Sequence, residues 1–320
     1  MDLKKVGILE KDNFSEQAIK KLQRYYEVIL YEGNNDEKES ISKFISDKYA
    51  LFVRFAYQID DALISRATGL HYICSPTTGL NHISVSSPNI QIVSLKGEYD
   101  FLSTIRATPE HIIGLTFALL RNYKFAFRST DNSEWNRDPY RGYEIYNNNI
   151  GIIGCGRIGK LLCGFFQAFG AIVHAYEVDH NRCDDLKDSY IKLHDSVEDV
   201  IRSSDIVILC VNYEPKNEKM ITKKHFDLLK DKYFINASRG ELINENDLLG
   251  FLEKGEFRGV ALDVFANETG EMTIYRQALD LSSKKNVIIT PHIGGATFTS
   301  MHRTEEFITD KLLKIDGVLK

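Results

Sequence analysis

Three charged or titratable side chains follow three successive predicted strands in the second half of the chain. They are Arg239, Glu268 and His292, and the strands before them are predicted at Tyr233–Ala237, Gly259–Phe265 and Asn286–Thr290. Each residue by itself would be an ordinary surface or loop residue. Because the carboxyl ends of parallel strands meet at one edge of a sheet, we expect the three to gather in one site.

The three residue types fit the reduction of a carbonyl group. Hydride transfer to a ketone builds negative charge on its oxygen, so a proton donor must lie within hydrogen-bonding reach. Histidine, with an unperturbed pKa of about 6.5, can donate or accept that proton near neutrality. A carboxylate such as that of Glu268 favours a protonated ring and fixes its orientation. The fork of Arg239 can hold a carboxylate or polarise the carbonyl.

A glycine-rich turn predicts where a dinucleotide would bind. Residues 154–159 read Gly-Cys-Gly-Arg-Ile-Gly, the pattern G-x-G-x-x-G, between a predicted strand and a predicted helix. Gly154 allows the sharp turn, Gly156 lacks the Cβ that would block a pyrophosphate, and Gly159 lets the helix pack closely on the strand. The N-terminus of that helix offers N–H groups and positive dipole to the phosphates. The alternative, glycines that serve only a tight turn, is disfavoured by this strand–turn–helix setting.

An acidic residue stands where an adenosine ribose would need an acceptor. A second apolar run, Ala171–Tyr176, ends in Glu177, 18 residues past Gly159. A carboxylate there can accept hydrogen bonds from the ribose hydroxyls and repels a 2′-phosphate. We therefore predict NAD rather than NADP as the cofactor.

Apolar runs alternate with helical patterns along the chain, which predicts parallel sheets covered by helices on both faces. In the first half they occupy Val6–Leu9, Ser15–Tyr26, Val28–Tyr31, Lys38–Ile45, Ala50–Phe55, Ile59–Ala67, Tyr72–Ser75 and Ile90–Leu95. In the second half they occupy Ile150–Ile153, Lys160–Phe169, Ala171–Tyr176, Ser196–Ser203, Asp205–Val211, Lys223–Leu229, Tyr233–Ala237, Asn246–Lys254, Gly259–Phe265, Asn286–Thr290 and Thr299–Leu319. The fold class is therefore α/β, and the second half has the strand count of a complete dinucleotide-binding fold.

The segments between the two halves have different characters. Pro109–Tyr123 is a long helix that is apolar on more than one face, so we expect it to be buried between domains or subunits. Ser129–Tyr146 is polar and rich in turn residues, and we expect a loop that wraps the domain junction. For the polar segment Lys96–Ile105 two interpretations stay open, a wall of the substrate cleft or a surface excursion.

Two loops after predicted strands of the first half are candidate substrate contacts. Arg54-Phe55-Ala56 follows one strand, and residues 75–82, Ser-Pro-Thr-Thr-Gly-Leu-Asn-His, follow another. The second loop is rich in hydroxyls and backbone N–H groups, which suits an anion such as a carboxylate. An ordinary Pro/Gly turn explains it equally well.

Composition and charge exclude several classes of protein. With 320 residues, 43% hydrophobic and 27% charged, the chain is expected to be globular with about two domains. A net charge of −5 gives no reason to expect nucleic acid or an anionic membrane as partner. No run approaches the ~18 apolar residues that span a bilayer, and the first residues lack the apolar core of a signal peptide. Five cysteines without C-x-x-C spacing indicate buried thiols, a cytoplasmic protein and no metal site.

Four segments resemble the D-isomer-specific 2-hydroxyacid dehydrogenase family. They are GIIGCGRIGK at 151–160, INASRGELINENDL at 235–248, GVALDVFANE at 259–268 and TPHIGG at 290–295. Residues 77–82 also resemble the loop with which this family binds the substrate carboxylate. The likeness spans almost the whole chain, and its later motifs are far more specific than the glycine pattern.

The resemblance implies an NAD-dependent enzyme that interconverts a 2-oxoacid and a D-2-hydroxyacid, built from two doubly wound parallel-sheet domains around a cleft. A flavodoxin-like substrate domain would comprise residues 1–108 and 297–320, and a Rossmann NAD-binding domain residues 109–296. Family members are commonly homodimers with the Pro109–Tyr123 helix at the interface, so a homodimer is expected.

The resemblance also implies a role for individual residues. His292 would be the acid/base, Glu268 its carboxylate partner, and Arg239 the residue that orients the 2-oxoacid. Further substrate contacts would come from Arg54, Thr78 and Gly79. The implied NAD contacts are Gly154, Gly156, Arg157, Ile158, Gly159, Glu177, Cys210, Val211, Ala237, Ser238, Asp263, His292 and Gly294.

Two positions depart from the family pattern, and other classes of protein must be weighed. Thr269 stands after Glu268 where the family has proline, and Glu177 stands where it has aspartate. A non-catalytic NAD-sensing or corepressor-like protein would share the fold and the triad. A formate dehydrogenase carries a different set of residues around its histidine, and an S-adenosylmethionine methyltransferase would share only the glycine loop. The sequence does not name the side chain of the substrate.

Overall fold

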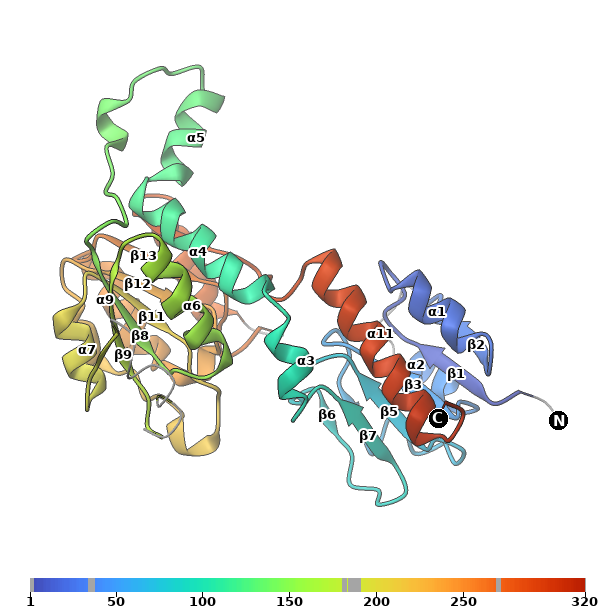
Figure 1. The fold of residues 1–320 in the computed structure, drawn as a ribbon. Coiled ribbons are helices and arrows are strands. Elements are labelled where there is room, and N and C mark those ends of the chain that lie inside the picture. The colour runs from blue at the N-terminus through green and yellow to red at the C-terminus, as the bar shows by residue number, and fades with distance from the viewer. Residues whose placement is uncertain (1–2, 34–37, 180–182, 184–190, 269–271, 320) are drawn as a thin grey trace. The chain divides into compact units, whose positions relative to one another are not determined.

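A computed structural model describes the whole chain except residues 1–2, 34–37, 180–182, 184–190, 269–271 and 320 (Figure 1). The chain forms two compact units, Met1–Ile105 with Ala296–Lys320, and Arg106–Gly295. Within the described ranges, no helix is both long and apolar enough to cross a membrane. The same ranges contain no group of three or more His, Cys, Asp or Glu residues that could hold a metal ion.

The first unit is built on a parallel five-stranded sheet in the order β2-β1-β3-β5-β7. Its strands are β1 (Lys5–Ile8), β2 (Glu27–Leu30), β3 (Ala50–Phe52), β5 (Tyr72–Ser75) and β7 (Gln91–Ser94). The short strands β4 (Ile59–Asp60) and β6 (Ile83–Ser84) pair separately, also in parallel. With those two left aside, the strand order is that of flavodoxin-like folds, which confirms the predicted class.

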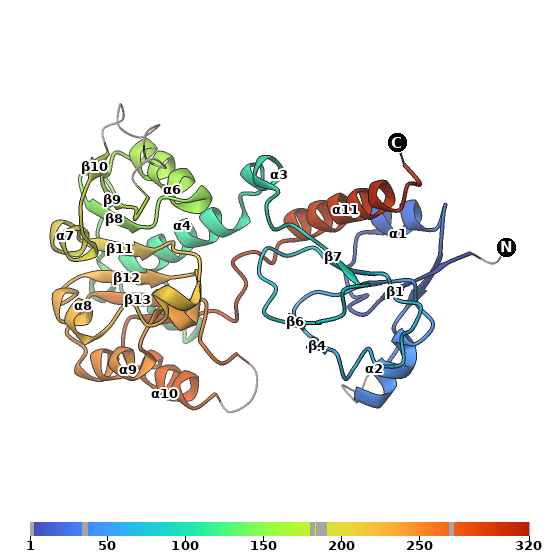
Figure 2. The same ribbon diagram turned by 90° about the horizontal axis from the view of Figure 1, so that it is seen from below.

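Helices cover both faces of this sheet (Figure 2). On one face, α1 (Glu16–Leu22) and α11 (Phe298–Ile315) share a core with the side chains of Val6 and Ile8. On the other face lies α2 (Lys38–Ile45), so close that a Cβ added to Gly7 would lie 2.9 Å from the ring of Phe44. Successive residues of a strand point to opposite faces, which explains this alternation. The remaining helix, α3 (Tyr99–Ser103), follows β7.

The second unit contains a parallel seven-stranded sheet in the order β10-β9-β8-β11-β12-β13-β14. Its strands are β8 (Asn149–Ile153), β9 (Ile172–Tyr176), β10 (Lys192–Leu193), β11 (Ile206–Leu209), β12 (Tyr233–Asn236), β13 (Gly259–Leu262) and β14 (Val287–Ile289). Numbered within the unit, this order reads 3-2-1-4-5-6, the doubly wound dinucleotide order, with a seventh strand at one edge.

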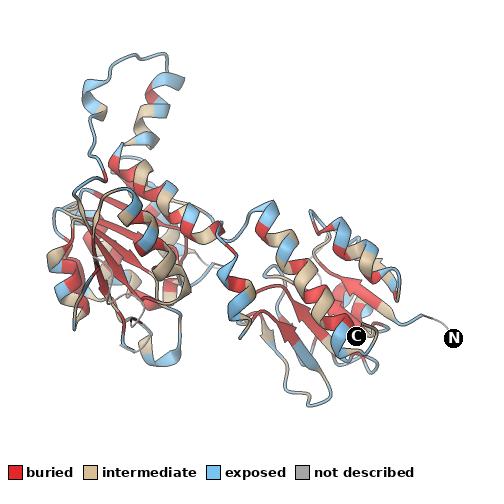
Figure 3. Ribbon diagram, viewed as in Figure 1, coloured by how far each residue is buried: buried red, intermediate tan, exposed pale blue. Residues whose placement is uncertain are grey.

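The helices of the second unit also form two layers, and buried residues line the strands between them (Figure 3). On one face α4 (Ala107–Leu120) and α6 (Arg157–Ala168) pack against a core that includes Ile150 and Ile152. On the other face the core includes Ile153 and Val207. The helices of that layer are α7 (Val197–Ser203), α8 (Lys223–Leu228), α9 (Glu245–Lys254) and α10 (Thr273–Ser282).

Two segments differ from the sequence prediction. The loop predicted over Ser129–Tyr146 is partly wrong, because α5 (Tyr123–Asp131) runs into it and the 3-10 turn η1 (Asp138–Tyr140) lies inside it. Lys124 anchors α5 through bonds from Nζ to the carbonyls of Ser282 and Val287, at 2.7 and 2.9 Å, which no local pattern reveals. The second difference is α10, because the sequence analysis predicts no helix between Gly259–Phe265 and Asn286–Thr290.

Candidate active site

The glycine turn between β8 and α6 contains three glycines in three different settings. Gly154 has a φ of +97°, and a Cβ there would lie 2.8 Å from the carbonyl oxygen of Cys210. A Cβ on Gly159 would lie 2.0 Å from the carbonyl oxygen of Gly154, so α6 rests directly on the turn. Gly156, the N-cap of α6, has nothing within 4 Å of its Cβ position. The turn therefore leaves open space at a helix N-terminus, a favourable place for an anion.

Glu177 lies behind this turn, at the end of β9. Its side chain is buried, and Oε2 accepts a hydrogen bond from the backbone N–H of Cys155 at 2.9 Å. Oε1 accepts from the backbone N–H of Asp179 at 3.3 Å. A carboxylate can accept about four hydrogen bonds, so these two leave room for further donors. The contacts place Glu177 on the turn, beside the first two glycines.

Asp263 braces the loop that carries His292. Its carboxylate accepts from Thr290 Oγ1 at 2.6 Å and from the backbone N–H groups of Ile293 and Gly294 at 2.9 and 2.8 Å. Its backbone carbonyl accepts the N–H of His292 at 2.8 Å. His292 has a φ of +53°, which is unfavourable for a residue with a side chain. These bonds on both sides hold the histidine in that conformation.

A histidine from α4 completes the surroundings of Asp263. Nε2 of His111 lies 3.3 Å from Oδ1 of Asp263 and 3.3 Å from Oγ1 of Thr290. Burial alone would raise the pKa of Asp263, but the hydrogen bonds from His111, Thr290 and the two backbone N–H groups lower it below its usual value. Asp263 is therefore a buried carboxylate that is ionised at neutral pH and holds the loop of His292 through hydrogen bonds.

Glu268 and His292 are paired. Oε2 of Glu268 lies 2.6 Å from Nδ1 of His292, and Oε1 accepts from the backbone N–H of Phe265 at 3.2 Å. Both side chains are about one-third exposed, so small molecules can reach them. A carboxylate on Nδ1 assigns a proton to that nitrogen and fixes the orientation of the ring. Thr269, the departure from the family pattern beside this pair, lies outside the described residues.

Arg239 lies one strand away from Glu268. Its Nη1 donates to the carbonyl of Ser238 at 2.7 Å, and its own carbonyl accepts from Asn236 Nδ2 at 3.0 Å. A Cβ on the next residue, Gly240, would lie 2.0 Å from the carbonyl carbon of Phe265. The Arg239 turn therefore packs directly against the segment that leads to Glu268. Strands β12, β13 and β14 are neighbours in the sheet, so the three predicted catalytic residues follow three adjacent strands.

The other predicted cofactor contacts lie along the same carboxyl edge of this sheet. They are Arg157 and Ile158 at the start of α6, Cys210 and Val211 after β11, and Ala237 and Ser238 after β12. The hydroxyl of Ser238 donates to the carbonyl of Leu209 at 2.5 Å, which ties the β12 turn to β11.

In the first unit, the loop of residues 75–82 is braced from within. Oγ of Ser75 lies 2.8 Å from Oγ1 of Thr77 and 3.1 Å from Nε2 of His82. Oγ1 of Thr77 donates to the carbonyl of Gly79 at 2.8 Å. The two hydroxyls that the sequence offered as ligand donors are therefore bonded inside the loop, whereas Thr78 is exposed.

The side chain of Arg54 is turned into its own unit. Nη1 donates to Oε1 of Glu305 on α11 at 3.2 Å, and Nη2 donates to the carbonyls of Glu10 and Asp12 at 3.0 and 3.1 Å. Glu305 is fully buried, also accepts the N–H of Ser15 at 2.7 Å, and has its pKa raised by burial to about 7. In this structure Arg54 ties the end of β3 to α11.

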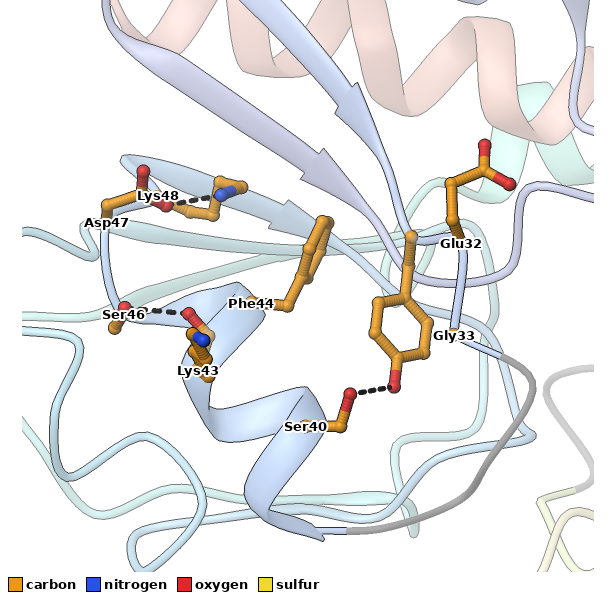
Figure 4. A pocket seen from close by; sticks show the side chains of 9 residues that line it. Glu32, Gly33, Ser40, Lys43, Phe44, Ser46, Asp47 and Lys48 are labelled. Atoms are coloured by element: carbon orange, nitrogen blue, oxygen red, sulfur yellow. Dashed lines mark hydrogen bonds and ion pairs between the residues drawn. The ribbon is translucent and has the colours of Figure 1, made fainter.

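A pocket of about 520 Å³ also lies in the first unit, where α2 faces the end of β2 (Figure 4). None of the residues predicted for the site lines it. Some of its polar groups pair with one another, as Ser40 Oγ does with the Tyr31 hydroxyl at 2.9 Å and Lys48 with Asp47.

Residues 113–294 match the model of the NAD binding domain of D-isomer specific 2-hydroxyacid dehydrogenases. The chain belongs to this family. Its second unit is accordingly the NAD-binding part of a D-2-hydroxyacid dehydrogenase fold, and NAD is the cofactor, as the glycine turn and Glu177 predict.

Several family relatives match nearly the whole chain. One from Staphylococcus saprophyticus, whose name assigns it provisionally to the 2-hydroxyacid dehydrogenases, is 30% identical over 302 residues, 91% of each protein. D-3-phosphoglycerate dehydrogenase of Methanocaldococcus jannaschii is 29% identical over 97% of this chain and 57% of its own length. The structure of Aquifex aeolicus D-lactate dehydrogenase with NAD and lactic acid shares the fold, with a TM-score of 0.82 at 22% identity over 98% of this chain and 96% of that one.

Sequence reasoning missed three residues of this family member that the structure brings beside the predicted ones. His111 lies inside an apolar helix and Glu305 inside an amphipathic one, so neither position stands out. Glu245 begins α9 and accepts the N–H of Ala266 at 2.7 Å, close to Glu268. His111 and Glu305 lie outside the family-like segments, and Glu245 lies within the segment 235–248 without standing out in it, so only the folded chain shows their contacts.

Proposed function

We propose that the protein is an NAD-dependent dehydrogenase that interconverts a 2-oxoacid and a D-2-hydroxyacid by hydride transfer. The contact of 2.6 Å between Glu268 Oε2 and His292 Nδ1 carries this proposal. A carboxylate on Nδ1 leaves Nε2 as the nitrogen that exchanges a proton with the substrate oxygen. Membership of the dehydrogenase family supports the same reaction.

The residues at the glycine turn suit NAD. We assign the pyrophosphate to Gly154–Gly159, because the Gly156 position opens on free space at the start of α6. We assign the ribose hydroxyls to Glu177, whose carboxylate already faces the turn. The nicotinamide end we assign to Ser238, Asp263 and Gly294, which lie beside the catalytic strand ends. Cofactor in its reduced form supplies the hydride.

The chain's own residues handle the substrate and the proton. Protonated His292 donates from Nε2 to the ketone oxygen as negative charge builds there, and Glu268 stabilises the imidazolium. Arg239 holds the substrate carboxylate and polarises the carbonyl with its fork of donors. In the reverse direction neutral His292 accepts the hydroxyl proton.

The first unit supplies further substrate contacts in this proposal. We assign residues 1–108 and 297–320 to a substrate domain and residues 109–296 to an NAD-binding domain. Thr78 and Gly79 offer backbone N–H groups to the substrate carboxylate, and Arg54 adds positive charge. The five free thiols fit a reducing, cytoplasmic compartment.

We also propose a homodimer formed through α4 and the segment that follows it. This segment, residues 121–148 between α4 and β8, is called the arm. Large aromatic side chains are exposed on this arm, among them Phe127, Trp135 and Tyr143. Apolar surface of this kind marks interaction sites in soluble proteins. Analytical ultracentrifugation tests this proposal, and a monomer at micromolar concentration would contradict it.

An assay of NADH oxidation over a panel of 2-oxoacids, including sugar-derived ones, tests the proposed function. The wild type is expected to oxidise NADH with at least one of them, and His292→Gln to lose that activity while binding NADH as before. A wild type that binds NADH but turns over none of the panel would instead indicate an NAD-sensing protein.

A further inference from the structure

Three buried side chains form a continuous hydrogen-bonded chain beneath the loop of residues 75–82. Nε2 of His82 lies 3.1 Å from Oγ of Ser75, and that oxygen lies 2.8 Å from Oγ1 of Thr77. Oγ1 of Thr77 in turn donates to the carbonyl oxygen of Gly79 at 2.8 Å. We call these three side chains the relay. Its members are at least nine-tenths buried, so solvent does not compete for their protons.

The carbonyl oxygen of Gly79, at the end of the relay, determines which group donates in each hydrogen bond of the relay. A carbonyl oxygen can only accept, so the single hydroxyl proton of Thr77 goes to Gly79. Thr77 must then accept from Ser75, whose own single proton is used in that bond. Ser75 therefore accepts from His82, which must carry its proton on Nε2.

Two properties of His82 agree with this assignment. Nδ1 is buried and has no hydrogen-bond partner in the described part of the chain, so a proton on this nitrogen would have no acceptor. The ring also packs edge-on against Phe55, with centroids 4.9 Å apart. Burial lowers the pKa of His82 to about 4, so the ring is neutral at physiological pH and one of its nitrogens must be bare.

The relay sets the orientation of peptide groups in the loop. In a planar trans peptide, the C=O of one residue and the N–H of the next point in opposite directions. The carbonyl of Gly79 points to Thr77 Oγ1, and the carbonyl of Thr77 accepts the N–H of Leu95 at 3.2 Å. The N–H groups of Leu80 and Thr78 therefore point away from these two internal partners.

We propose that His82 is a positioning residue for the substrate. Acting through Ser75 and Thr77, it holds the Gly79–Leu80 peptide so that the N–H of Leu80 joins that of Thr78 in binding the substrate carboxylate. The inference rests on the proposed function and adds to it a donor, Leu80, and the relay that aims it. A carboxylate that accepts two backbone N–H groups is bound equally in the ground and transition states, so the relay acts on substrate affinity and not on chemistry.

Matched variants at His82 separate this role from simple packing. His82→Phe keeps a flat ring against Phe55 and removes the donor, whereas His82→Gln can place an N–H near the position of Nε2. We expect His82→Phe to raise KM for the best 2-oxoacid about tenfold, with kcat and the Kd for NADH unchanged. His82→Gln is expected to restore most of the affinity, which a packing defect would not allow.

Breaking the relay at its middle provides a second comparison. Ser75→Ala is expected to raise KM about as much as His82→Phe does. The double variant Ser75→Ala/His82→Phe is expected to be no worse than either single one, because both cut the same chain. Additive effects would contradict a relay.

The protonation state of His82 can be read without any substrate. A two-bond ¹H–¹⁵N correlation spectrum, with the His82 signals assigned from their loss in His82→Phe, is expected to show a protonated Nε2 and a bare Nδ1. A spectrum that shows a protonated Nδ1 and a bare Nε2 overturns the inference. If His82→Phe does not fold, the loss of the signals in His82→Gln supplies the assignment instead. If the wild type is active and His82→Phe has the same KM, the positioning role of His82 is wrong but the proposed function stands. If the wild type is inactive with every 2-oxoacid, both the proposed function and this role are wrong.

Discussion

Oε2 of Glu268 lies 2.6 Å from Nδ1 of His292, although 24 residues separate them in the chain. The two residues follow β13 and β14, which are adjacent parallel strands, so the sheet itself brings them together. Asp263 further fixes the position of His292. Its carboxylate accepts hydrogen bonds from Thr290 and Gly294, on either side of His292, and so holds the backbone of His292 at a positive φ. The pair is therefore preorganised by the fold.

Glu177 is expected to decide between the two nicotinamide dinucleotides. NADH should bind more tightly than NADPH, because the carboxylate beside the glycine turn accepts from ribose hydroxyls and repels a 2′-phosphate. Glu177→Gln should weaken NADH binding about tenfold, because a lost hydrogen bond to a charged group costs ~1.5 kcal/mol. The same variant should show a smaller difference between its affinities for NADH and NADPH. Fluorescence titration measures both affinities, with Glu256→Gln on the exposed surface as the control. NADPH binding as tight as NADH binding would remove Glu177 from this role.

Arg239→Ala is expected to raise KM for the 2-oxoacid and to lower kcat as well. One guanidinium contacts both the bound carboxylate and the developing charge in our proposal, so binding and chemistry should both suffer. The Kd for NADH should hardly change, and Arg239→Lys should recover only part of the activity because it lacks the fork. Arg202→Ala, at an exposed arginine paired with Asp199, is the control. If KM and kcat of Arg239→Ala both stay within twofold of wild type, Arg239 does not contact the substrate.

Two glycines of α6 provide a matched pair of substitutions. Gly159→Ala would place a Cβ 2.0 Å from the carbonyl oxygen of Gly154, whereas the Cβ of Gly164→Ala meets nothing within 4 Å. We expect Gly159→Ala to lose NADH affinity and stability, because α6 must move off the turn. Gly164→Ala is expected to keep NADH affinity and gain up to about 1 kcal/mol, the helix propensity difference between the two residues. Thermal unfolding with and without NADH makes this comparison, and equal behaviour of the two variants would contradict the close approach at Gly159.

Glu305 is expected to make stability depend on pH. Burial raises its pKa to about 7, even though the Ser15 N–H and the charge of Arg54 act to lower it. The native carboxyl therefore binds its proton more tightly than the unfolded one, so its stabilising contribution is full below about pH 4.5 and is lost as the pH rises toward 7. Glu305→Gln does not titrate, so its stability relative to wild type should increase over that window by up to about 3 kcal/mol.

Urea unfolding followed by circular dichroism at several pH values measures this difference. His82 supplies a control of opposite sign: its native pKa is lowered to about 4, so its contribution is present above pH 6.5 and is lost as the pH falls toward 4. His82→Phe should therefore gain relative to wild type as the pH falls, while Glu305→Gln gains as it rises. A stability difference for Glu305→Gln that does not vary with pH would show that Glu305 is ionised throughout.

The sequence was sufficient for those parts of the fold and site that depend on local pattern and strand order. The residues that follow β12, β13 and β14 could be placed at one edge, since consecutive parallel strands of a doubly wound sheet share it. The three settings of Gly154, Gly156 and Gly159 could be anticipated because a strand–turn–helix leaves little choice of backbone.

What the sequence could not show is which side chains bind one another across large separations. Arg54 and Glu305 are 251 residues apart, and no periodicity links them. The hydroxyls of Ser75 and Thr77 looked available to a ligand, but a buried hydroxyl needs a partner, and here they satisfy each other. Side-chain direction is decided by packing between distant segments, which only the folded chain supplies.

The pH dependence of kcat/KM for 2-oxoacid reduction tests the central claim most directly, in wild type, Glu268→Gln and His292→Gln. Reduction requires a protonated His292, so its rate should fall as the pH rises, while oxidation of the hydroxyacid should rise over the same range. Without the Glu268 charge, Nδ1 loses the charged acceptor that orients the ring, so Glu268→Gln should lower kcat/KM for reduction while keeping more activity than His292→Gln.

His292→Gln should lose activity at every pH, by roughly the 10²–10⁴-fold typical of a removed acid/base group. A deuteride isotope effect should first confirm that hydride transfer limits the rate. Equal kcat/KM in Glu268→Gln and wild type would show that the 2.6 Å contact does not prepare His292 for proton transfer. A fully active His292→Gln would contradict the account altogether.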